Sequence, residues 1–275
     1  MLAVTALSSY LYCPRKLYLE YVLKLAPPPK DILVKGSIKH KMFEEINKAE
    51  EMIVTSINKQ TNVAAVYKRV YYDILKSVIK NNLEKLKEVE VDPIDVFRES
   101  WDIFLREARI RIKTVSDFIA RNNIYGKELW EKLTPKYLSE TWVSSEKLGI
   151  RGIVDRIEVN NEQYIPFELK SGKAPDTGVW PNHRIQLVAY LLLMSENYGR
   201  AINQGFVEYI DLEEKRRVVL DPFAEQHLKD LILEVNHLLH SEKVPEKVDN
   251  ENKCNACGLK DKCFKLRQEY VQNLD

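Results

Sequence analysis

The chain has 275 residues, 45% of them hydrophobic, and its 42 basic and 41 acidic side chains leave a net charge of +1. A chain of this length can form one large domain, and its near-zero charge excludes nucleic-acid binding through overall positive charge alone. There is no apolar run of about 18 residues, and the first residues turn polar too early for a signal peptide, so we expect a cytoplasmic protein without a membrane span.

The first half of the chain is predicted to be helical. Two short helices are expected on either side of Cys13-Pro14, because proline suits the first turn of a helix. Apolar residues then recur at helical spacing, with one break at Asp92-Pro93. The expected helical segments cover about 5–24, 31–52 and 63–123. We interpret the block over about 60–125 as a helical insertion or lid.

The second half of the chain alternates between strand and helix patterns. The expected strands cover about 139–146, 151–159, 163–170, 204–211 and 215–220, and the expected helices cover 183–197 and 222–240. Strands joined by a crossover helix indicate a mixed α/β sheet flanked by helices. We therefore predict a single domain over residues 1–275.

Residues 151–173 predict a hairpin whose apolar strands carry charged side chains. Asp155 lies on the first strand, and Glu168 and Lys170, two residues apart, share one face of the second. Buried charges are costly unless they are paired or bound to a metal. A divalent cation would neutralise the carboxylates, and the lysine could hold a water or balance phosphoryl charge. This pattern indicates metal-assisted phosphodiester hydrolysis.

A second Glu-x-Lys pair in the chain serves as a comparison. Glu213 and Lys215 have the same spacing but lie in the polar segment "DLEEKRR", with no partner aspartate. We interpret this copy as an ordinary solvated hairpin tip.

Taken together, the motifs resemble the PD-(D/E)xK nuclease superfamily in its RecB-like branch. The motifs are Gly152-x-x-Asp155, Glu168-x-Lys170 and Gln186-x-x-x-Tyr190. The resemblance implies a restriction-endonuclease-like core and assigns catalytic roles to Asp155, Glu168, Lys170, Gln186 and Tyr190. Gln186 and Tyr190 are four residues apart on the expected helix, so they share one face.

The same resemblance implies a histidine metal ligand on an early helix. Gly36 and His40 fit this motif, because they share a helix face and the glycine allows close approach to the sheet. The implied ligands of Mn²⁺ or Mg²⁺ are His40, Asp155, Glu168 and the Leu169 carbonyl. An imidazole ligand shifts the preference toward Mn²⁺. Lys170 would orient the attacking water.

Four cysteines form a second constellation, one near the start of the chain and three in a C-x2-C-x5-C tail. They are Cys13, Cys254, Cys257 and Cys263. In a cytoplasmic protein this spacing favours a metal site over disulfides. Four thiolates can hold zinc or an iron–sulfur cluster, and the residues alone do not decide between them.

The segment "CPRKLYLEY" and the cysteine tail, around a RecB-like core, resemble the CRISPR-associated (Cas-four) exonuclease family. The resemblance implies an iron–sulfur cluster, with [4Fe–4S] favoured over [2Fe–2S]. This cluster would join residues 1–24 to residues 245–275.

DNA contacts are expected beside these sites. Basic residues near the cysteines are either ordinary solvated surface or a phosphate-binding track; they are Arg15, Lys16, Lys253, Lys260, Lys262, Lys265 and Arg267. Aromatic side chains that could stack bases are Tyr12, Tyr18, Trp180 and Tyr190.

The resemblance predicts a metal-dependent DNA nuclease, acting as an exonuclease on single-stranded or overhang DNA. It also implies a role in trimming fragments for CRISPR spacer acquisition, beside the integrase complex. One alternative is a DNA repair or viral recombination nuclease of the same fold. A different alternative is a non-catalytic DNA-binding scaffold in which the cluster is only structural. The oligomeric state is left open.

Overall fold

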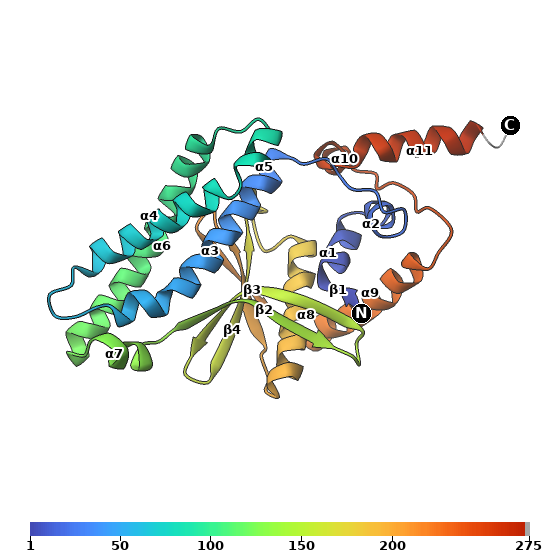
Figure 1. Ribbon diagram of the computed structural model, residues 1–275. Coiled ribbons are helices and arrows are strands. Elements are labelled where there is room, and N and C mark those ends of the chain that lie inside the picture. Colours follow the sequence, from blue (N-terminus) through green and yellow to red (C-terminus); the bar gives the residue numbers. More distant parts are fainter. Residues whose placement is uncertain (273–275) are drawn as a thin grey trace.

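The computed structural model describes residues 1–272, with side chains described up to Leu266. A mixed sheet lies between two groups of helices (Figure 1). The strands are β1 (Leu2–Ala3), β2 (Lys136–Ser145), β3 (Ile150–Asn160), β4 (Gln163–Lys170), β5 (Gln204–Tyr209) and β6 (Glu214–Val219). The predicted fold class, a mixed central sheet flanked by helices, is confirmed.

The helices make up most of the first half of the chain and the tail. They are α1 (Val4–Tyr12), α2 (Pro14–Tyr21), α3 (Asp31–Thr55), α4 (Val63–Lys80), α5 (Leu83–Glu88), α6 (Pro93–Asn122), α7 (Gly126–Lys132), α8 (Pro181–Tyr198), α9 (Pro222–Leu239), α10 (Glu251–Ala256) and α11 (Lys260–Gln272). None of the helices in residues 1–272 combines the length and the apolar character that a membrane span requires.

Several elements differ from the sequence-based expectation. The helical block breaks a second time between α4 and α5, where Asn81 ends α4 and the Asn82 side chain bonds back to the Val78 carbonyl at 2.8 Å. Strand β1 was not expected, because two residues are too few to show an alternating pattern. The helices α10 and α11 in the cysteine tail were not expected either.

The sheet order is β1-β3-β4-β5-β6, and β2 pairs with the remaining edge of β3. Strands β4 and β5 are parallel and are joined through α8, whereas β3–β4 and β5–β6 are antiparallel hairpins. A parallel pair needs a crossover connection, and α8 provides it. As a result, α8 lies against the sheet beside the ends of β3 and β4.

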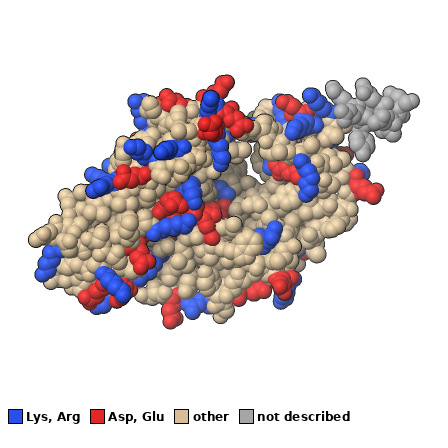
Figure 2. Space-filling model, in the orientation of Figure 1, with Lys and Arg blue, Asp and Glu red and all other residues tan. Residues whose placement is uncertain are grey.

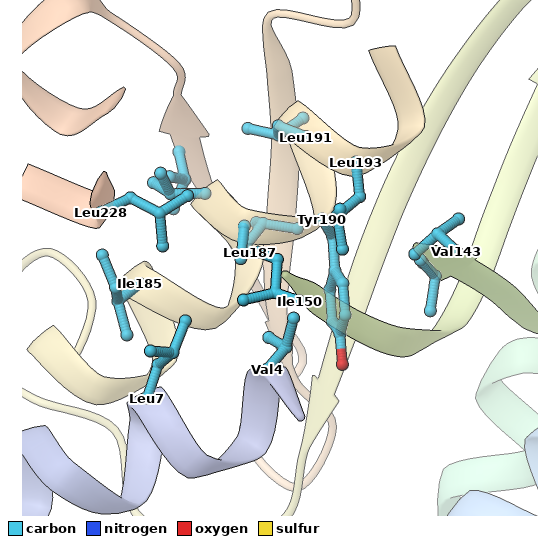
Figure 3. Packing of buried hydrophobic residues seen from close by; sticks show 14 of the residues in the cluster. Val4, Leu7, Val143, Ile150, Ile185, Leu187, Tyr190, Leu191, Leu193 and Leu228 are labelled. Atoms are coloured by element: carbon cyan, nitrogen blue, oxygen red, sulfur yellow. The ribbon is translucent and has the colours of Figure 1, made fainter. Parts of the chain in front are cut away.

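One face of the sheet packs against α1, α8 and α9. Figure 3 shows Val4 and Leu7 of α1 meeting leucines of α8, with the Tyr190 ring beside Val143 of β2. Tyr190 is 2% exposed, yet its hydroxyl points out of the leucine cluster. A buried tyrosine hydroxyl needs a polar partner, so we expect polar groups where the Tyr190 hydroxyl leaves the apolar cluster.

The opposite face packs against α3, α4, α6 and α7 around a buried ion network. The Arg111 guanidinium of α6, 1% exposed, contacts Glu107 at 2.8 Å and Glu50 of α3 at 2.9 Å. It also bonds to Asn47 and lies 3.9 Å from the centre of the Tyr137 ring of β2. One cation thus ties the helical block to α3 and to the sheet.

The two ends of the chain lie together. The Tyr12 hydroxyl donates to the Lys253 carbonyl at 2.8 Å, and the Lys253 ammonium donates to the Tyr12 carbonyl at 3.1 Å. Arg15 donates to the carbonyls of Pro245 and Cys263, and Lys262 to the Ala26 carbonyl. Arg15, Lys253 and Lys262 thus use donors within the protein, whereas Arg267 lies outside the residues whose side chains are described; the phosphate track stays a prediction.

We predict that Arg111→Ala lowers the free energy of unfolding by about 3–5 kcal/mol, because it leaves Glu50 and Glu107 buried without their cation. A matched control is Lys113→Ala on the same helix, where a 77% exposed lysine pairs with Asp117, also four residues along. This control should change stability by less than about 0.5 kcal/mol. Urea unfolding followed by circular dichroism measures both, and equal losses would contradict the role given to Arg111.

Candidate active site

Two carboxylates, a half-buried Asp155 and a buried Glu168, meet where strands β3 and β4 diverge. Their ladder runs as far as Arg156–Phe167, and the next position places Asp155 opposite Glu168. Here the Asp155 side chain replaces a backbone acceptor, since its Oδ2 accepts a 2.7 Å hydrogen bond from the Leu169 amide. The two carboxylates therefore share one face of the sheet, as the sequence predicted.

Lys170 connects this pair to α8. Its Nζ donates to Glu168 Oε1 at 2.6 Å and to Gln186 Oε1 at 3.2 Å. The Gln186 amide nitrogen in turn donates to the Tyr190 hydroxyl at 3.2 Å. The structure thus brings together all five residues proposed as catalytic: Asp155, Glu168, Lys170, Gln186 and Tyr190.

Gly152 explains how α8 comes so close to β3. A Cβ at this position would lie 2.5 Å from Tyr190 Cε1 and 3.2 Å from a methyl of Val4. Only a glycine lets the tyrosine ring cross β3 here, which places its hydroxyl beside Gln186. The glycine of the Gly152-x-x-Asp155 motif is therefore required for the packing of α8 against β3 beside the site.

His40 reaches the carboxylates from α3. Its Nδ1 lies 3.6 Å from Asp155 Oδ1. One turn earlier, a Cβ on Gly36 would come within 2.8 Å of the Ser171 hydroxyl, so the glycine permits close approach, as expected. Lys39 fixes the same turn, because it pairs at 2.5 Å with Asp211, whose other oxygen accepts from the Gly172 amide.

Burial and charge repulsion act strongly on Glu168. It is 1% exposed, and burial, followed by the neighbouring Asp155 charge, raises its pKa from 4.5 to about 8. Its second oxygen, Oε2, has no hydrogen-bond partner among the described residues. An unpartnered buried carboxylate oxygen is a costly arrangement that a bound cation would relieve.

The pKa values of the groups around Glu168 shift in directions that favour a negative charge on Asp155. Burial acts to raise the pKa of Asp155, but His40, Lys170 and the Leu169 amide outweigh it and lower that pKa. Burial acts to lower the pKa values of His40 and Lys170, and the carboxylates outweigh it and raise both. The site therefore favours ionised Asp155 opposite a protonated Glu168.

Glu140 of β2 belongs to this site, although no sequence motif marked it. The β2–β3 register is interrupted at the one position that would pair Glu140 with Asp155, and Glu140 adopts φ +50° there. Burial, then Asp155 and Glu44, raise the pKa of Glu140. A left-handed non-glycine residue inside a strand, opposite the carboxylate pair, is typical of functional sites.

The donor set fits a hard divalent cation. Within the described residues, no group of three or more histidine, cysteine or acidic side chains is arranged so that it could hold a metal ion without adjustment. Nevertheless Asp155, Glu168 and His40 converge, and Glu168 Oε2 is free of hydrogen bonds. Carboxylate oxygens suit Mg²⁺ and Mn²⁺, and an imidazole favours Mn²⁺.

The four cysteines line one small apolar cavity between the chain ends. They are Cys13, Cys254, Cys257 and Cys263, all as free thiols. The Leu259 amide donates to Cys257 Sγ at 3.4 Å, and Arg15 Nε donates to Cys263 Sγ at 3.1 Å. Such donors stabilise thiolate ligands of zinc or of an iron–sulfur cluster, so the residues fit either group.

Some expected DNA contacts are wrong. Tyr18 and Tyr190 are 4% and 2% exposed, which excludes base stacking on them, and the Tyr12 hydroxyl joins the chain ends. Trp180 is 42% exposed, so base stacking on this side chain stays a prediction. The exposed tryptophan beside the site is Trp142, which the sequence did not single out.

Glu213 of the comparison pair lies exposed in the turn between β5 and β6, so the expected solvated hairpin tip is confirmed for it. Lys215 lies on β6, with its Nζ 3.8 Å from Glu208 and 4.0 Å from Glu158. Strand β6 pairs Lys215 with Glu208, on the sheet face away from α8. It is thus a second lysine–glutamate contact on the sheet, remote from Asp155.

Comparison with known proteins agrees with this geometry. A sequence profile of the PD-(D/E)XK nuclease superfamily matches residues 1–264, nearly the whole chain. This match confirms the resemblance that the motifs suggested.

Curated relatives share parts of the chain. A CRISPR-associated exonuclease Cas4/endonuclease Cas1 fusion of Leptospira interrogans is 30% identical over 158 residues, 53% of this chain and 29% of that protein. The CRISPR-associated exonuclease Cas4 of Rhodospirillum rubrum is 30% identical over 44% of this chain and 37% of its own length. The DNA replication ATP-dependent helicase/nuclease dna2 of Schizosaccharomyces pombe is 22% identical over 96% of this chain, which spans 18% of that protein. The chain thus covers well under half the length of each.

The raised pKa of Glu168 predicts how stability depends on pH in metal-free protein. Between about 4.5 and about 8 the folded protein keeps the Glu168 proton and the unfolded chain loses it, so the free energy of unfolding should fall as pH rises. His40, with its raised pKa, adds loss in the same direction above pH 6.5 in any variant. Glu168→Gln should flatten the profile, because an amide does not titrate. Denaturant titrations of the parent and Glu168→Gln across this pH range test the prediction. If the free energy of unfolding falls equally with pH in both proteins, the raised pKa of Glu168 is contradicted.

Proposed function

The chain belongs to the PD-(D/E)XK nuclease superfamily, and on this premise we propose that it hydrolyses phosphodiester bonds in single-stranded or overhanging DNA. The observation that supports this most is the Asp155–Glu168 pair, in which the buried Glu168 has one unpartnered carboxylate oxygen. A scaffold that only binds DNA has no use for this costly arrangement.

We propose that His40, Asp155, Glu168 and the Leu169 carbonyl hold Mn²⁺ or Mg²⁺. When bound, the cation supplies Lewis-acid stabilisation of phosphate charge. The chain's own groups prepare for it: the Leu169 amide orients Asp155, and His40 keeps Asp155 ionised. Loading the cation requires Glu168 to give up its proton, since a ligating carboxylate must be ionised.

Lys170 has a distinct role in this proposal. Its ammonium is held by Glu168 and by the Gln186 carbonyl oxygen, and Gln186 is held by Tyr190. This chain of contacts fixes a compact cation beside the carboxylates, where it can orient the attacking water and balance charge on the phosphate. Gln186 and Tyr190 act as positioning residues for Lys170.

We further propose that the four cysteines carry an iron–sulfur cluster, with [4Fe–4S] favoured over [2Fe–2S]. The cavity that they line lies between the chain ends, so the cluster would clamp residues 1–24 to residues 245–275. Free thiols in this arrangement suit a reducing cytoplasm.

The biological role proposed is trimming of DNA fragments for CRISPR spacer acquisition beside the integrase. The Leptospira relative is a fusion of an exonuclease Cas4 and an endonuclease Cas1 in one chain, which supports such a partner. The helicase/nuclease dna2 relative, aligned over nearly all of this chain, supports the alternative of a repair nuclease.

Lys170→Met should lower the rate of Mn²⁺-dependent cleavage of a labelled single-stranded oligonucleotide by about 10²- to 10³-fold, the usual loss for one electrostatic stabiliser. Lys215→Met is the matched control, because it also removes a lysine beside a buried glutamate on the same sheet. The control should cleave like the parent. Equal loss in both variants would mean that sheet stability, and not chemistry, explains the effect of Lys170.

The cluster proposal predicts brown protein that contains about four iron atoms per chain and acid-labile sulfide. Cys257→Ser should lose the colour and lower the thermal unfolding temperature, since the cluster joins the chain ends. Anaerobic purification followed by iron, sulfide and zinc analysis provides the test. Colourless parent protein with one zinc per chain would disprove the iron assignment.

A further inference from the structure

An exposed apolar pair lies directly beside the carboxylates. Trp142 of β2 and Ile153 of β3 face each other across the two strands and are 55% and 41% exposed. Edge strands rarely expose large apolar side chains, because these promote aggregation. Strand β2 is an edge strand that pairs only with β3 in the described sheet, so this exposure calls for an explanation.

The pair is continuous with the proposed active site. Trp142 and Ile153 are each two residues from the carboxylates Glu140 and Asp155 on the same strands, a spacing of about 7 Å. A groove of about 460 Å³ is lined by Glu140, Trp142, Ile153, Asp155, Gln186 and Tyr190. The groove lies where β3 leaves β1 at Arg151 and has not yet joined β4 at Arg156. Figure 2 shows a hollow near the middle of the molecule and a largely uncharged surface over the β2–β3 region.

Arg151 adds a positive charge at the outer end of this groove. Its guanidinium carbon lies 5.5 Å from the centre of the Trp142 ring, within cation–π range, and the side chain is exposed. The carboxylates at the inner end repel phosphates unless a cation covers them. The groove therefore runs from an acidic, cation-accepting end, past an apolar surface, to a basic end.

We infer that Trp142 and Ile153 form a stacking platform for a nucleobase of the single-stranded DNA next to the cleaved phosphate, with Arg151 contacting the backbone. This inference rests on the proposed nuclease function and names a subsite of the same site. Aromatic side chains bind single strands by stacking without regard to sequence, and Arg binds phosphate. Inside a duplex both faces of each base are stacked on its neighbours, so the platform favours unpaired bases.

The test compares DNA with bases and DNA without them. Two fluorescein-labelled oligomers of equal length are used, oligo(dT) and an abasic chain with the same phosphates. Binding is measured in Mn²⁺, so that a cation can cover the carboxylates, and the parent and every variant in this comparison carry Lys170→Met to slow cleavage. Trp142→Ala should weaken oligo(dT) binding by between about 5- and 100-fold, the loss expected for one stacked base. Its affinity for the abasic chain should equal that of the parent. Arg151→Ala should weaken both oligomers by a similar factor.

Three further variants separate stacking from other effects. Trp142→Phe should restore oligo(dT) affinity and Trp142→Leu should not, because only the ring offers a π face. Phe223→Ala, which removes an 87% exposed aromatic side chain on α9, should bind both oligomers like the parent.

The contrary outcomes are distinct. If Trp142→Ala binds oligo(dT) like the parent, or loses both oligomers equally, the platform is wrong. A shift in sedimentation on losing Trp142, with DNA affinity unchanged, would make the pair a protein interface and overturn the inference. Parent protein that neither binds nor cleaves either oligomer would contradict the proposed function itself.

Discussion

The repulsion between Asp155 and Glu168 is the constraint on which the rest of the site depends. Two adjacent carboxylates, one buried and one half-buried, cannot both carry an uncompensated charge without a large cost in free energy. The protein balances one with His40 and the Leu169 amide and leaves the other protonated, with a free oxygen. Such a pair is poised for a divalent cation, which would turn an unfavourable arrangement into a binding site.

The surrounding architecture holds this pair in place from both faces of the sheet. On one face, α8 approaches β3 closely enough for Tyr190 to lie over Gly152. On the other, α3 brings His40 to the sheet and is itself tied down by Lys39 and by the Arg111 network at Glu50. The long helical block therefore contributes to the site indirectly, because α6 anchors the helix that carries His40 (Figure 1).

The motif residues could be predicted because strand and helix periodicities place them on one face without any tertiary information. Asp155, Glu168 and Lys170 converge as their spacing suggested, and Gln186 and Tyr190 join them as the family resemblance implied. Glu140 and Trp142 could not be found this way, because their position depends on the register of β2 against β3 and on an interrupted pair. The turn and strand around Lys215 were expected, but its contact with Glu208 was not, because that contact depends on the register of β6 against β5. The internal hydrogen bonds of Arg15 and Lys262 could not be predicted either, because they depend on how the two chain ends fold together.

The central claim is that the Asp155–Glu168 pair is a cation site. Anomalous X-ray diffraction at the manganese edge, from crystals of parent protein soaked in Mn²⁺, tests it most directly. We expect one strong anomalous peak within coordination distance, about 2.0–2.3 Å, of oxygens from both Asp155 and Glu168. A peak confined to other residues, or no peak at a concentration that supports cleavage, would contradict the account.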